Sequence, residues 1–256
     1  MTDQIGEQQE RRVSTIREEF MKQWFAIALS VGFATALAEM PWLREGVLDW
    51  SLPIDWTQVE QMVRLFVAAL ATGLSWDGYF QSISNKPIED GPRFTIDVLL
   101  VFLYLFLLLT SKFSYFWLTI HAVAFLFYIA WDYLSIRKHR AAYVNAPPAS
   151  DGFVPTVREV YKGSLGDDPR IYRGPAVTLM WPIYFWTLPL SYWLVLTASD
   201  RAKPITTLVY AVWVCLGLLA YRRDKKVKLP FWSRWVLLLG SASAVLGSDL
   251  ILRVVR

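Results

Sequence analysis

The segment FSYFWLTIHAVAFLFYIAWDYLSIRKHR, residues 113–140, decides the fold class of this chain. It is apolar over residues 113–130 and closes on three basic residues, Arg137, Lys138 and Arg140. A helix needs about 20 apolar residues to cross a bilayer, and basic residues gather at cytoplasmic helix ends. The segment therefore predicts a transmembrane helix over 113–135 whose carboxyl end faces the cytoplasm.

The polar residues of this segment share one helical face. At about 100° per residue, spacings of seven, seven, four and three bring them together. They are Ser114, His121, Tyr128, Asp132 and Ser135. In a membrane helix, such a stripe faces other helices or water and not lipid. The pattern thus predicts a protein with several spans.

The composition agrees with a membrane protein. The 256 residues are 55% hydrophobic and 19% charged, too apolar for a soluble domain of this length. The net charge of +4 comes from basic residues at the ends of apolar runs, which indicates membrane topology and not nucleic-acid binding. One cysteine and two histidines exclude an intrachain disulfide, a cysteine metal site and a histidine-rich di-iron site. We expect no cofactor and leave metal binding open.

The apolar runs predict an all-α polytopic bundle of about seven spans. With the amino terminus in the cytoplasm, most of the 26 Lys and Arg residues fall on the inner side, as the charge rule requires. Residues 24–256 then form one transmembrane domain with a cytoplasmic loop at 141–174, in an inner membrane of bacterial type. The expected spans are 24–40, 59–82, 94–110, 113–135, 175–197, 204–221 and 230–254.

Residues 1–23 are polar and carry apolar residues at helical spacing, namely Val13, Ile16 and Phe20. This spacing predicts an amphipathic helix on the cytoplasmic membrane surface, the alternative being a frayed tail. The apolar run over residues 24–40 resembles a signal peptide, but the long polar segment before it favours a signal-anchor that is not cleaved.

Charged residues inside the spans suggest a site. Asp77, Asp97, Asp132 and Arg234 lie near inner helix ends, and His121 lies near the midplane, at about 1.5 Å per residue. One hypothesis is a cation or proton path along the fourth span, formed by His121, Tyr128 and Asp132 with Asp77 and Asp97. The alternative is that Asp77 or Asp132 pairs with Arg234 and only fixes helix packing.

Two other patterns concern helix contacts. Pro182 and Pro189 lie seven residues apart in the fifth span, where they form a hinge or gate, or else static kinks. The seventh span has small residues at close spacing, which let a neighbouring helix, a partner subunit or a second copy approach. These are Gly240, Ala244, Gly247 and Ser248.

The sequence contains no motif of a known catalytic class: no Gly-x-Ser-x-Gly, no His-Glu-x-x-His and no phosphate loop. The leading hypothesis is an ion- or proton-linked channel, transporter or sensor in a lipid bilayer. The alternative is a non-catalytic membrane subunit or anchor that docks a partner through its amino-terminal helix, long inner loop and seventh span. A third reading is a lipid-modifying enzyme at the inner carboxylates.

Overall fold

The computed structural model describes most of the chain. The described residues are 2–40, 43–44, 47–48, 56–83, 86–145, 153–166, 168–198 and 204–229, with Trp235, Leu237, Leu239 and Gly240. Within them the regular secondary structure is helical, apart from a small antiparallel hairpin of β1 (Leu43–Arg44) and β2 (Val47–Leu48). The helices are α1 (Thr2–Ala38), α2 (Trp56–Ile83), α3 (Gly91–Leu109), α4 (Ser114–Lys138), α5 (Val157–Leu165), α6 (Gly174–Ala198) and α7 (Pro204–Lys226), with 3₁₀ turns η1 (Thr110–Lys112) and η2 (Arg140–Tyr143).

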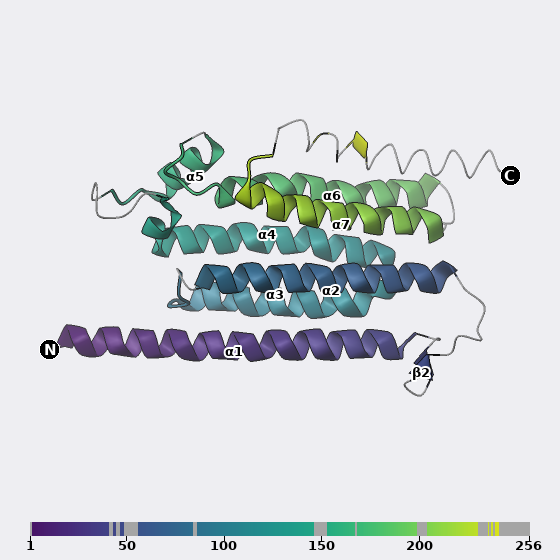
Figure 1. Ribbon diagram of the computed structural model, residues 1–256, viewed down its shortest axis with the longest axis horizontal. Coiled ribbons are helices and arrows are strands. Elements are labelled where there is room, and N and C mark those ends of the chain that lie inside the picture. Colours follow the sequence, from purple (N-terminus) through teal and green to yellow (C-terminus); the bar gives the residue numbers. More distant parts are fainter. Residues whose placement is uncertain are drawn as a thin grey trace.

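The long helices lie side by side in a bundle and alternate in direction along the chain (Figure 1). α1 packs on α3, α3 on α4, α4 on α6, and α2 on α7. At one end, called the α5 end, α2, α4 and α7 finish, α3 and α6 begin, and α5 and η2 cover the bundle. The opposite end carries the hairpin and η1, and is called the hairpin end. The packed pairs α1–α3 and α2–α7 therefore run parallel, and α3–α4 and α4–α6 run antiparallel.

Local signals start the helices at the α5 end. Asp90 precedes α3 and accepts a hydrogen bond of 2.7 Å from the backbone N–H of Arg93, while Pro92 occupies the first turn. α5 begins with a capping box, in which Thr156 and Glu159 each accept from the other's backbone N–H. These caps place the loop that follows α2 and the cover formed by α5 over the same end of the bundle.

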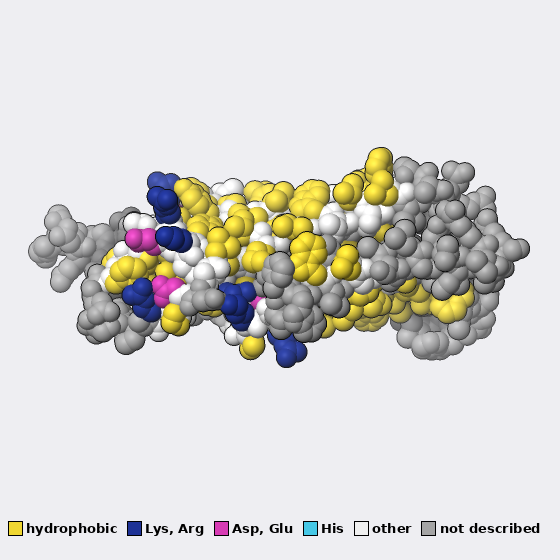
Figure 2. Space-filling view, turned by 90° about the horizontal axis from the view of Figure 1, so that it is seen from above, with side chains coloured by type: hydrophobic (Ala, Val, Ile, Leu, Met, Phe, Trp, Pro, Cys, Tyr) yellow, Lys and Arg dark blue, Asp and Glu magenta, His cyan; other side chains and the backbone are white. Residues whose placement is uncertain are grey.

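Among the residues that the structure describes, three helical segments are long and apolar enough to cross a membrane: Arg12–Ala38, Gly91–Lys112 and Ser114–Lys138. The surface of the bundle carries large apolar side chains, with Ile183 68% and Phe116 60% exposed, whereas the polar residues Asp97 and His121 are buried. Such an inverted distribution suits a lipid-facing surface. Figure 2 shows hydrophobic side chains along the middle of one face and Lys and Arg side chains gathered toward one end.

The expected amphipathic segment 1–23 belongs to a longer helix, and its location at the cytoplasmic membrane surface stays a prediction. α1 runs through residue 23 as one continuous helix. The reason is that one buried face continues along it at spacings of seven, four, three, four and four. This face consists of Ser14, Met21, Phe25, Ala28, Gly32 and Ala36.

The other helices occupy the ranges where spans were expected, with boundaries shifted by a few residues. α2, for example, covers 56–83 where 59–82 was predicted, and α6 covers 174–198 where 175–197 was predicted. The 141–174 connection contains the end of η2 and the whole of α5. Most of the expected seventh span, 230–254, lies outside the described residues.

Candidate functional site

A cavity of about 830 Å³ opens at the α5 end between α2, α3, α4 and α7, and η2, α5 and the start of α6 border its mouth. This volume lies in the range of small-molecule sites, about 300–1,000 Å³. Basic residues outnumber acidic ones around it, so the cavity favours an anion. The described lining contains Lys86, Arg173, Arg222, Lys225, Lys226 and Lys228, against Asp97, Asp132 and Asp168.

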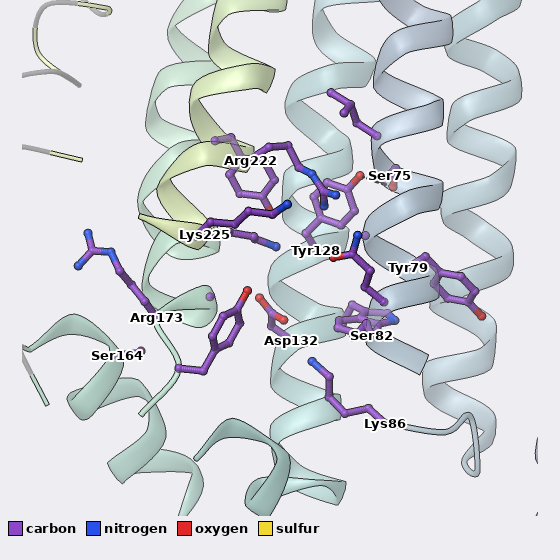
Figure 3. Close-up of a pocket in the computed structure, with 18 of the residues that line it drawn as sticks. Ser75, Tyr79, Ser82, Lys86, Tyr128, Asp132, Ser164, Arg173, Arg222 and Lys225 are labelled. Carbon is purple, nitrogen blue, oxygen red and sulfur yellow. Dashed lines mark hydrogen bonds between the residues drawn. The ribbon is translucent and has the colours of Figure 1, made fainter. Parts of the chain in front are cut away.

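Asp132 of α4 lies at the centre of the cavity, between Lys225 above it and Lys86 below it in Figure 3. Its side chain is buried, with the residue 7% exposed, and Oδ2 accepts no hydrogen bond from the described residues. A buried acceptor without a donor costs free energy. Because Asp132 also lines the cavity, its carboxylate can accept a hydrogen bond from a bound ligand.

Lys86 follows α2 and enters the cavity from below. Its Nζ lies 4.4 Å from the ring centroid of Tyr143 and 5.3 Å from that of Trp131. Burial lowers the pKa of Lys86 to about 8; Asp132 opposes this shift, and Lys225 and Arg93 reinforce it. The charge at this position therefore responds to pH just above neutrality.

Arg222 and Lys225 reach into the cavity from the last turns of α7. Arg222 donates to the carboxylate of Asp77 on α2, which also accepts from Gln81 at 2.8 Å. A Cβ on Gly78 would collide with Nη1 of Arg222, so the glycine leaves room for the guanidinium. Lys225 places its Nζ 4.6 Å from the ring centroid of Tyr221. The contact between α2 and α7 thus sets the positions of two cations.

The deep end of the cavity is closed by hydroxyl groups. Ser75 of α2 and Tyr128 of α4 are joined by a hydrogen bond of 2.7 Å, and Tyr104 of α3 contacts both hydroxyls. The surrounding lining is apolar, so the cavity is cationic near its mouth and apolar inside. The apolar residues are Ala71, Leu74, Leu100, Phe125 and Leu218.

A second, small cavity of about 20 Å³ lies beyond this closure and is lined by Tyr104, Tyr128 and His121. One water molecule needs about 10–15 Å³ of such space. His121 is 3% exposed and donates from Nδ1 to the carbonyl oxygen of Trp117 at 2.9 Å. Its Nε2 has no partner among the described residues. Asp132, Tyr128 and His121 therefore follow one another from the cavity toward the middle of the bundle.

Two of the three carboxylates expected to form a cation site have separate partners. Asp77 pairs with Arg222, and Asp97 accepts a hydrogen bond of 2.7 Å from the indole of Trp131. Among the described residues there is no group of three His, Cys, Asp or Glu side chains that could hold a metal ion. The idea of a cation or proton path along α4 remains a prediction.

The remaining sequence candidates lie away from the cavity. Pro182 and Pro189 both sit buried inside α6, which continues through them. The hinge and the kink readings both stay open. A Cβ on Gly240 would lie 2.8 Å from the Trp213 ring of α7, consistent with close packing there. Four further candidates lie outside the described residues, namely Arg234, Ala244, Gly247 and Ser248.

Sequence reasoning missed the cations of the cavity. Lys86, Arg222 and Lys225 were counted only as basic residues at helix ends, which set orientation. Tyr104 was not singled out because α3 is apolar almost throughout. The signal available in the sequence was the position of Lys86 and Arg222 at the inner ends of two spans, the same layer in which Asp77 and Asp132 lie.

Comparison of the chain with protein-family models, with curated proteins and with solved structures gives no match.

Proposed function

We propose that the chain is a multi-pass protein of a bacterial-type inner membrane, with about seven spans and a cytoplasmic amino terminus. Exposed apolar side chains on α6 and α7 support bilayer crossing by these helices as well; examples are Leu190, at 58%, and Val212, at 52%. Basic side chains concentrate at the α5 end, including Arg137, Lys138, Arg223 and Lys226. The charge rule assigns that end to the cytoplasm.

Within this topology, the protein acts as a proton-linked transporter. The observation that carries the proposal is a row of three polar residues on α4 between the large cavity and the buried histidine. Asp132 lies in the cavity, Tyr128 in its closure, and His121 beside the small cavity behind the closure. Carboxylate, hydroxyl and imidazole groups pass protons along hydrogen bonds, and charged groups retained inside a membrane are often functional. A cavity open at one end and closed at the other matches one state of alternating access.

A proton-flux assay on liposomes tests this function. Full-length protein is reconstituted with an enclosed pH-sensitive dye, and flux after a pH jump is compared for the wild type and Asp132→Asn. We expect flux in the wild type and its loss in Asp132→Asn, because the amide cannot accept a proton from the cavity. The control is Glu39→Gln, which neutralises an exposed carboxylate paired with Lys112 at the hairpin end.

Circular dichroism and gel filtration establish that each variant is folded. Silent liposomes for a folded wild type would contradict the transport proposal. Loss of folding in Asp132→Asn alone would instead assign that carboxylate to helix packing.

A second candidate function is a docking subunit of a larger membrane complex. It is favoured by α1, whose amino-terminal turns project beyond the neighbouring helices in Figure 1. This function predicts a stoichiometric partner that stays bound when the protein is extracted from its own membrane in mild detergent. A lone, monodisperse protein that is active in liposomes would exclude it.

A further inference from the structure

Three cationic side chains from two elements converge on one part of the cavity. Figure 3 shows Arg222 and Lys225 extending from α7 and Lys86 extending upward from below. In the described part of the chain, Lys86 and Lys225 form no ion pair, and both rest against aromatic rings. A half-buried cation that forms no ion pair is stabilised by a bound anion. The convergence therefore indicates an anion site.

The arrangement favours a tetrahedral anion over a planar one. Lys86 approaches from the opposite side to Arg222 and Lys225, so the donors do not lie in one plane. A phosphate group offers acceptor oxygens in several directions, whereas a carboxylate offers two in one plane. Lysine binds phosphate as a point charge, and arginine adds directed N–H donors.

The apolar part of the cavity lies deeper along the same helices. Phe125 is seven residues before Asp132 on α4, which is about 10 Å at the helical rise. Leu218 of α7 and Leu100 of α3 line the same cavity. An aliphatic chain extending from an anion at the mouth would remove this surface from water.

From these features we infer that the cavity binds a phosphate-bearing amphiphile. Its phosphate lies among Lys86, Arg222 and Lys225, and a neighbouring hydroxyl donates to the carboxylate of Asp132. Its apolar part extends toward Leu100, Phe125 and Leu218. The inference rests on the proposed function in one respect, which is that the cavity mouth lies at the cytoplasmic membrane surface. Both a membrane phospholipid and a soluble phosphate ester carry this chemistry.

Calorimetric titration of full-length protein in an uncharged detergent distinguishes these sources. The probes are inorganic phosphate, glycerol 3-phosphate, dihexanoyl phosphatidic acid and dihexanoylglycerol, which lacks the phosphate. We expect dihexanoyl phosphatidic acid to bind roughly tenfold or more tightly than glycerol 3-phosphate, because its chains bury apolar surface. Dihexanoylglycerol should not bind measurably.

Equal affinity for glycerol 3-phosphate and the lipid would support the anion site but overturn the apolar part of the inference. No binding of any phosphate probe would overturn the inference, and so would equal binding of dihexanoylglycerol. Binding is measured without a gradient. If the protein binds the lipid but conducts no protons, this inference stands and the transport proposal is contradicted. If it conducts protons but does not bind the lipid, only this inference is contradicted.

Substitutions of residues that line the cavity test whether the ligand binds there. Lys86→Gln and Lys225→Gln should each weaken binding of dihexanoyl phosphatidic acid by about tenfold or more, because each removes a charge-assisted hydrogen bond. Arg223→Gln is the matched control, since Arg223 is exposed on the same turn of α7 and does not line the cavity. Lys225→Arg should restore binding. Equal weakening by Arg223→Gln would show a bulk charge effect and overturn the assigned site.

Discussion

Lys86 is the residue through which we expect the cavity to respond to pH. Asp132 faces it from α4, Lys225 from α7 and Arg93 from α3, and burial lowers its pKa to about 8. A bound anion favours the charged amine, so binding takes up a proton when the pH lies above this value. The neutral amine formed at higher pH does not attract the anion.

We therefore predict that affinity for dihexanoyl phosphatidic acid falls as the pH rises through about 8, by up to about tenfold per pH unit. Lys86→Arg should keep its affinity to higher pH, because a guanidinium stays protonated. Calorimetric dissociation constants measured on both sides of this pH check the prediction. Because the ligand phosphate titrates equally in both proteins, identical pH profiles for the wild type and Lys86→Arg would contradict it.

At the scale of elements, the contact between α6 and α7 depends on a glycine. A Cβ on Gly217 of α7 would collide with the ring of Tyr184 on α6. The hydroxyl of Tyr184 donates to the carbonyl oxygen of Trp213 at 2.7 Å, so the ring cannot swing away without losing this bond. The two helices are therefore held at close range by one small residue and one tyrosine.

Gly217→Ala should destabilise the protein by about 1–3 kcal/mol, the usual cost of overpacking. Gly73→Ala is the control, since no heavy atom lies within 4 Å of a Cβ at Gly73 in α2. That change should leave stability equal or raise it by a few tenths to about 1 kcal/mol, because alanine favours helices. Thermal unfolding of the wild type and both variants in the same detergent measures these changes in stability. A Gly217→Ala protein as stable as Gly73→Ala would show that α6 and α7 pack less closely.

At the scale of the whole molecule, the two bundle ends should face different compartments. We predict that a membrane-impermeant maleimide labels Arg158→Cys, on α5, only from the cytoplasmic side. Thr57→Cys, at the start of α2, should be labelled only from the outer side, because basic residues concentrate at the α5 end. Both positions are exposed, and Cys215→Ser serves as the background. Labelling of both cysteines from one side would contradict the proposed crossing by α2.

The site shows how far local sequence patterns reach. The stripe of His121, Tyr128 and Asp132 was visible from spacing alone, since helical periodicity puts these residues on one face. The partners of the carboxylates were not visible. Asp77 binds Arg222 of α7, 145 residues away, and Asp97 binds Trp131 of α4, 34 residues away. Such pairs depend on which helices become neighbours.

The sequence by itself determined the helical class, the approximate helix ranges and the basic character of one bundle end. These follow from hydropathy, helical period and turn residues, which act over a few residues of chain. Only the tertiary structure decided that α1 continues past residue 23 against the bundle and that α2, α3, α4 and α7 enclose a cavity. It also turned Lys86 and Lys225, two basic residues at helix ends, into opposite walls of that cavity. Packing between distant helices sets these positions, and no local pattern encodes it.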